Sequence, residues 1–248
     1  METTIRVLVA LALTGLLIML RLDAARFGAA EYDEPVAGEG RIRAWSRRIA
    51  WYVLGLALVA AIVVIHPTAT RDLLLAVGDR AGGVVLGVFF GLAGATQAVA
   101  LAWYHYRRVR LPDPASYPGA LTNEILTAFI DEATFRGALL GFLLLWGVDP
   151  LAAIPLQAIA YTLATRLGAP GRDRYMFGLS LVIGLVAGWA SVATGGIAAA
   201  FLGHAITRVA VFLTTGHAGQ PAPRGREIED VEKRRRAPEG WRPVERPR

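Results

Sequence analysis

The sequence predicts an all-α polytopic membrane protein with about seven transmembrane helices. Of its 248 residues, 54% are hydrophobic, and they gather in blocks of 15 to 25 residues rather than in a stripe with a 3.6-residue period. Lys and Arg lie mainly between alternate blocks, as expected for loops on one side of a membrane. The chain has no cysteine, so disulfides, thiolate nucleophiles and thiolate metal sites are excluded.

Seven apolar blocks are long enough to be spans, and they differ in their content of glycine, charged and polar residues. The first two are uninterrupted runs, the third and sixth carry glycines at four-residue spacing, the fourth is charged, and the fifth and seventh carry polar side chains. Because small residues on one face let helices approach closely, Gly83, Gly87 and Gly91 in the third and Gly184 and Gly188 in the sixth predict packing seams. The spans cover residues 5–20, 50–65, 82–104, 121–145, 151–167, 175–189 and 197–213.

The basic residues predict the orientation of the chain. With seven spans, the loops and tail on one side hold 20 Lys or Arg, or 21 with Arg166 at the end of the fifth span, and the loops on the other side hold 2. By the positive-inside rule the C-terminus is cytoplasmic and the N-terminus outside, in a bacterial inner membrane. Topology also accounts for the net charge of +6, so no nucleic acid partner is predicted. Cleavage of the first span as a signal peptide would invert every later loop; a retained first helix is preferred.

Three regions follow from this pattern. Residues 1–117 hold the N-terminal helices and their connecting loops, and residues 118–213 form the core with the polar spans. Residues 214–248 are rich in Pro, Arg and Glu and too poor in apolar residues to fold alone, so they predict a disordered basic tail. Its "KRRR" sequence suits anionic headgroups or a partner, or the tail simply fixes orientation.

The fourth span carries Asp131, Glu132 and Arg136 within "IDEATFRGALLGFLLLW". Each such charge costs about 3 kcal/mol at the centre of a membrane helix, so these side chains must face other protein groups or a water-filled cavity. Glu132 and Arg136 can pair across one turn, and Glu124 lies on the face of Asp131. An internal ion pair that only locks helices together would satisfy the same pattern.

Two other spans add polar groups at similar depth. Gln157, Tyr161 and Thr165 follow a four-residue step in the fifth span, and His204 and Arg208 lie one turn apart in the seventh. Three helices are therefore expected to converge on one polar site.

At these residues the sequence resembles a known family. "DEATFRGALLGFLL" is similar to the EExxxR segment of the CPBP family, the CAAX prenyl proteases and bacteriocin-processing or abortive-infection membrane proteins. The region from "YMFGLSL" to "GHAITRVAVF" resembles that family's last two helices, and the likeness covers about residues 118–213. The resemblance implies a glutamic intramembrane endopeptidase. In such enzymes a Glu and a His on the next helix activate water, and a later His and an Asn stabilise the oxyanion.

The chain departs from this pattern at three positions. An Asp replaces the first Glu, a Thr replaces the water-positioning His, and an Arg replaces the Asn. Threonine is no base at neutral pH. The arginine could either donate to an oxyanion or pair with Asp131 or Glu132. Altered or lost peptidase activity is therefore expected. The candidate catalytic residues carried over from the family are Asp131, Glu132, Arg136, Thr165, His204 and Arg208.

Three functions stay open from the sequence. The first is a reshaped peptidase with Glu132 or Asp131 as base, acting on a membrane protein or a membrane-anchored peptide. The second is a non-catalytic scaffold or accessory subunit, with partner subunits of a membrane complex. The third, an ion or proton transporter, lacks the expected inverted repeat. Membrane lipids are the surrounding partner. No cofactor is predicted, and no metal, because no two of the four histidines share a helix face at ligand spacing.

Overall fold

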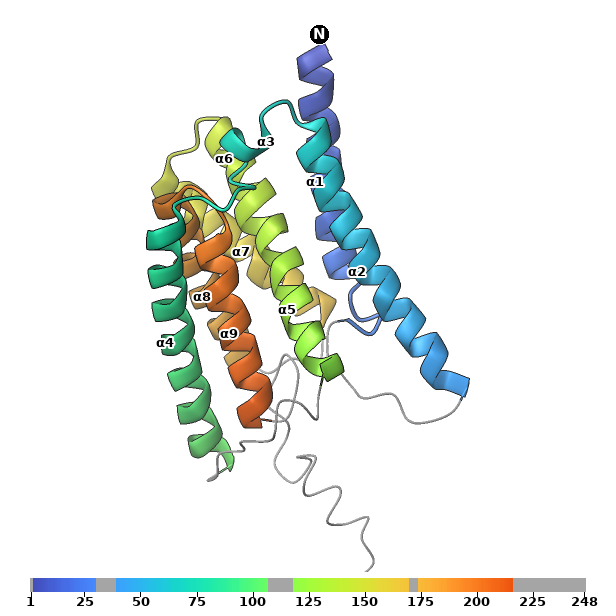
Figure 1. Cartoon of the computed structure of the whole chain (residues 1–248), viewed down its shortest axis with the longest axis vertical. Helices are drawn as coiled ribbons and strands as arrows, with labels where there is room; N and C mark the ends of the chain where they lie inside the picture. Colours follow the sequence, from blue (N-terminus) through green and yellow to red (C-terminus); the bar gives the residue numbers. More distant parts are fainter. Residues whose placement is uncertain (1, 30–38, 107–117, 170–173, 216–248) are drawn as a thin grey trace, which may run out of the picture.

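The computed structural model describes residues 2–29, 39–106, 118–169 and 174–215, and every regular element in these ranges is a helix (Figure 1). All but the first two residues of the predicted tail, 214–248, lie outside the described residues. The elements are α1 (Glu2–Leu22), α2 (Glu39–Ile65), α3 (Ala69–Asp72), α4 (Arg80–Tyr106), α5 (Pro118–Glu132), the π-helical segment η2 (Ala133–Leu139), α6 (Leu140–Leu145), α7 (Pro150–Gly168), α8 (Arg174–Thr194) and α9 (Ala198–Thr215).

Six of the seven predicted spans fall within a helix, the fourth within the continuous run α5–η2–α6, and the seventh begins one residue before α9. Four helices are long and apolar enough to cross a membrane, namely Glu2–Leu22, Trp45–Ile65, Arg80–Tyr104 and Met176–Thr194, and Ala198–Thr214 is a shorter apolar helix. The polar side chains of α5 and α7 lower the hydropathy of these two helices. The predicted fold class, a helical integral membrane protein, is confirmed.

The helices form two groups with the charged helix between them. In Figure 1, α1 and α2 lie on one side of α5, while α9 and α4 lie on the other. Glycines allow the tight packing of α4 on α9: a Cβ on Gly87 would lie 2.9 Å from the Ala199 carbonyl oxygen, and one on Gly91 would lie 2.7 Å from Ile206 Cβ. Gly184 of α8 meets Ala158 of α7 at 2.8 Å in the same way. The predicted seams are therefore real contacts.

The helix that carries the charges is not uniform. Between α5 and α6 lies the seven-residue π-helical segment η2, in which the backbone hydrogen bonds join residues five apart. π-Helices are rare in proteins, and those that occur are often found at functional sites. The loop after α3 packs against this region through two glycines. A Cβ on Gly141 would lie 2.4 Å from Leu73 Cα, and one on Gly137 would lie 2.3 Å from Leu75 Cδ2. The loop thereby holds η2 in the interior, with Arg136 fully buried.

The first helix, α1, ends two residues later than the predicted span. Arg21 was expected in the first loop, but α1 continues to Leu22 and Arg21 is only 1% exposed. Trp51 Nε1 donates a hydrogen bond of 2.9 Å to the Leu20 carbonyl. A Cβ on Gly168 would lie 2.4 Å from the Arg21 carbonyl oxygen, so α7 also packs closely here. The end of α1 is therefore enclosed by α2 and α7 and lies inside the bundle.

Candidate active site

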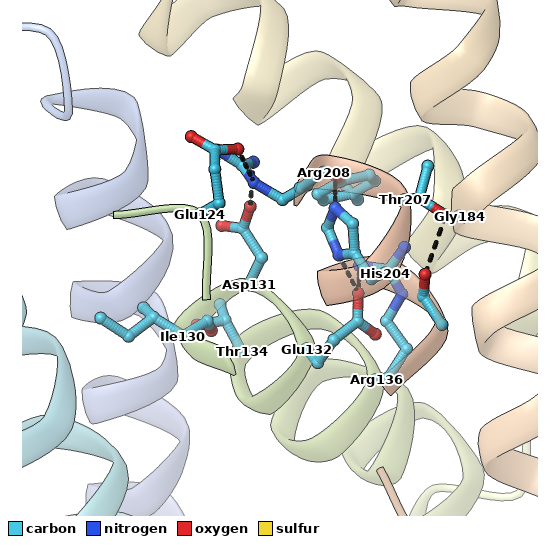
Figure 2. Close-up of polar contacts among 12 residues, drawn as sticks. Glu124, Ile130, Asp131, Glu132, Thr134, Arg136, Gly184, His204, Thr207 and Arg208 are labelled. Atoms are coloured by element: carbon cyan, nitrogen blue, oxygen red, sulfur yellow. Dashed lines mark hydrogen bonds and ion pairs between the residues drawn. The ribbon is translucent and has the colours of Figure 1, made fainter. Parts of the chain in front are cut away.

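A buried cluster of charged side chains lies at the centre of the bundle (Figure 2). α5 and η2 supply three carboxylates and one guanidinium, α9 supplies an imidazole and a guanidinium, and α1 supplies a third guanidinium. None of these side chains belongs to a residue more than 7% exposed. The members of the cluster are Arg21, Glu124, Asp131, Glu132, Arg136, His204 and Arg208.

Glu132 forms the most closely bonded part of the cluster. Its Oε1 lies 2.6 Å from His204 Nδ1 and 3.2 Å from Arg136 NH1, the turn-spaced pair that the sequence predicts. The other ring nitrogen of His204 lies 3.3 Å from the Tyr161 hydroxyl, and the Arg136 guanidinium stacks on the Tyr161 ring at 4.1 Å. Glu132 thus orients the imidazole, and its Oε1 already has two partners.

Arg208 connects the two acidic positions on the inner face of α5. Its Nε donates a 2.8 Å hydrogen bond to Glu124 Oε2, and its NH1 lies 3.9 Å from Asp131 Oδ2 (Figure 2). Asn123 also donates to Glu124 and accepts a 2.5 Å hydrogen bond from the Tyr52 hydroxyl. Of the pairings considered for Arg208, the structure gives Asp131 and not Glu132. Glu124 is its closer partner and lay outside the predicted site.

Arg21 is the cluster member that sequence reasoning missed. Its Nε lies 2.8 Å from Asp131 Oδ1, an ion pair without the alignment of a hydrogen bond. The sequence offered one weak signal, a basic residue directly at the end of the first apolar block. The positive-inside rule uses a basic residue at this position only to orient the chain in the membrane. No spacing in the sequence connects Arg21 with Asp131 of the fourth span.

The cluster is balanced in charge. The three carboxylates of Glu124, Asp131 and Glu132 face three guanidiniums, so the net charge is zero when the imidazole is neutral. Pairing of this kind offsets the large cost of removing each ion from water. The predicted convergence of α5 and α9 on one polar site is therefore observed, and α7 contributes Tyr161.

Thr165 is the predicted site residue that stands apart. It is buried on α7 one turn after Tyr161, but no hydrogen bond or ion pair joins it to the cluster among the described residues. The hydrogen bonds and ion pairs of the cluster therefore involve five of the six candidate residues. The catalytic role of all six stays a prediction.

A small cavity of about 30 Å³ opens beside the cluster. Its polar walls come from Glu124, Tyr161, Ser180, Thr207 and the two α9 residues His204 and Arg208. The volume suits one or two water molecules. Asp131, Glu132 and Thr165 do not line it, so this cavity reaches the imidazole but not the two carboxylates that the family pattern would use.

The arrangement restricts the chemistry that the cluster can perform. A general base must lie about 3 Å from the water that it activates. Glu132 Oε1 is engaged by His204 and Arg136, Asp131 is paired with Arg21, and Glu124, which does face the cavity, is held by Arg208. Among the described residues no group of three His, Asp or Glu side chains could hold a metal ion.

Comparison with known proteins identifies the region that contains the cluster. Residues 113–210 match the family model described as "Rce1-like: Type II CAAX prenyl endopeptidase Rce1-like", which confirms the resemblance to the CPBP family over this stretch. The matched stretch includes all six candidate residues and Glu124, whereas Arg21 lies before it. The search of curated proteins gave no significant match, and neither did the search of solved structures.

Proposed function

We propose, starting from the match of residues 113–210 to the type II CAAX prenyl endopeptidase family model, that this membrane protein keeps the peptidase bundle but has lost peptide-bond hydrolysis. One observation carries the proposal. Arg208, at the position where the family pattern has the oxyanion-binding Asn, is bound to Glu124 and lies 3.9 Å from Asp131. A guanidinium held in this way stabilises carboxylates of the resting protein rather than a charge that develops in a transition state.

The nucleophilic half of the reaction is impaired as well. Thr165 stands where the family pattern has the His that positions water, and a threonine hydroxyl cannot take a proton at neutral pH. The carboxylate of Asp131 is one methylene shorter than that of the expected Glu and is paired with Arg21. Both changes favour loss of hydrolysis over a mere change of specificity.

The remaining role that we propose is that of a scaffold or accessory subunit for other membrane proteins. A closed, charge-balanced interior would hold the helices in a fixed arrangement, which binding requires and turnover does not. The partner would be a subunit of a membrane complex, or a membrane-anchored peptide that is bound without cleavage. Purification in mild detergent as a stoichiometric complex would support this role, and a monomer with peptidase turnover would contradict it.

The hydrolysis claim is testable with the full-length chain in proteoliposomes. We expect a farnesylated CAAX peptide to be cleaved no faster by the wild-type chain than by Glu132→Gln, as measured by mass spectrometry of the released tripeptide. An active type II CAAX endopeptidase in matched vesicles controls for the substrate. Wild-type cleavage that disappears in Glu132→Gln would overturn the proposal, because it would show that the cluster still activates water.

A further inference from the structure

An apolar groove lies away from the charge cluster, below the loop that follows α3. It has a volume of about 560 Å³, within the range of ligand sites. Val59 and Val63 of α2 form one wall, Phe129 of α5 and Phe201 of α9 form the other, and Leu75 belongs to the loop above. The rings of Phe129 and Phe201 pack edge to face, with centroids 5.6 Å apart.

The loop over the groove is fixed in place. The Ala76 carbonyl accepts a 3.0 Å hydrogen bond from Ile197 N, and Asp79 N donates one of 2.7 Å to Thr194 O. A Cβ on Gly196 would lie 2.4 Å from the Ala76 carbonyl oxygen, so the loop rests directly on the start of α9. The groove is therefore preformed by bonded backbone rather than by a loosely packed segment.

The volume of the groove distinguishes between a transmembrane helix and a lipid acyl chain as its occupant. A transmembrane helix about 10 Å wide and 30 Å long occupies roughly 2,400 Å³, about four times the volume of the groove. An extended hydrocarbon chain is one carbon atom thick and suits this space. The α2 wall belongs to a membrane-spanning helix, and Val64 next to Val63 is 75% exposed on its outside. Lipid is therefore the neighbouring medium.

Polar groups occur at the end of the groove near α3. Thr70 lines it there, and the next residue, Arg71, has a side chain that is 78% exposed and lies 2.9 Å from Asp72. Hydrogen bonds from Arg71 and then Thr68 hold the pKa of Asp72 below its usual value, so both partners are charged at neutral pH. Arg71 and Asp72 thus place one positive and one negative side chain beside the groove, and such a pair suits a headgroup that carries both charges.

We propose that the groove binds one acyl chain of a zwitterionic phospholipid. The headgroup would lie beside α3, with its phosphate near Arg71 and its amine near Asp72. The acyl chain would pass between α2 and the aromatic pair of Phe129 and Phe201. This binding does not depend on whether the chain hydrolyses peptide bonds.

The full chain is reconstituted into vesicles of equal parts phosphatidylethanolamine and anionic phosphatidylglycerol, then purified in detergent and washed free of loose lipid. Bound phospholipid is measured by native mass spectrometry and by phosphorus content. The wild type should retain phosphatidylethanolamine in stoichiometric amount, and Val63→Trp, which fills the groove, should lose it to the background level. Val64→Trp, on the neighbouring exposed position of the same helix, is the matched control and should retain it.

Thr70→Trp provides a second variant at an exposed position near α3, where misfolding is not expected, and it should also lose the lipid. Equal retention by Val63→Trp, Thr70→Trp and the wild type would overturn the proposal. So would a wild-type chain that retains no phospholipid, one that retains only anionic lipid, or a crosslink from position 63 to another polypeptide.

Discussion

Replacing Arg208 by Met is expected to destabilise the folded bundle by about 3–5 kcal/mol, the usual cost of breaking a buried ion pair from one side. The substitution leaves the Glu124 carboxylate without its 2.8 Å partner and removes one of the two cations near Asp131. Reversible unfolding in mixed detergent micelles measures the change in the free energy of unfolding.

The double variant Glu124→Gln/Arg208→Met tests whether that loss arises from the pair. It removes both charges, so we expect it to recover most of the stability that Arg208→Met loses. If the two single substitutions instead add without coupling, the side chains act independently. The closed cluster would then not be what holds α5 and α9 together.

Replacing Arg21 by Met should have an effect of the same size. Asp131, which is only 1% exposed, would keep only the more distant Arg208 at 3.9 Å. We expect a loss of about 3–5 kcal/mol in the same unfolding assay, largely reversed by Asp131→Asn in the double variant. The result would establish that a residue outside the matched domain completes the cluster.

Arg26→Met supplies the matched control. Arg26 follows the same helix and pairs with Asp23 at 3.3 Å, but the Arg26 side chain is 81% exposed. Exposed pairs contribute about 0–1 kcal/mol, so this substitution should change stability little. Equal effects of Arg21→Met and Arg26→Met would mean that burial of Arg21 adds nothing.

The sequence predicted the parts of the fold that depend on hydropathy and spacing. Apolar blocks located the helices, four-residue glycine spacing located the packing faces of α4 and α8, and the Glu132–Arg136 spacing located an ion pair. Each is a property of one helix or of its surface, so local sequence determines it.

The partners across helices could not be predicted in the same way. Arg208 faces Glu124 at 2.8 Å because of the rotation and depth of α9 relative to α5, and no residue spacing encodes either. The sequence pattern places Arg21 in a loop, because a basic residue after an apolar block usually marks orientation. The π-helical segment η2 also escaped prediction, because the spacing of residues in the fourth span does not distinguish a π-helix from an α-helix.

The absence of native cysteine allows the closed site to be tested directly. A single cysteine at Thr165, the position at which the family pattern has its water-positioning His, reports whether water reaches the centre of the bundle. In permeabilised membranes, labelled with a small charged thiol reagent, Thr165→Cys should remain unmodified while Arg26→Cys reacts fully. Labelling of Thr165→Cys at a rate close to that of Arg26→Cys would show a water-filled active site and contradict the account.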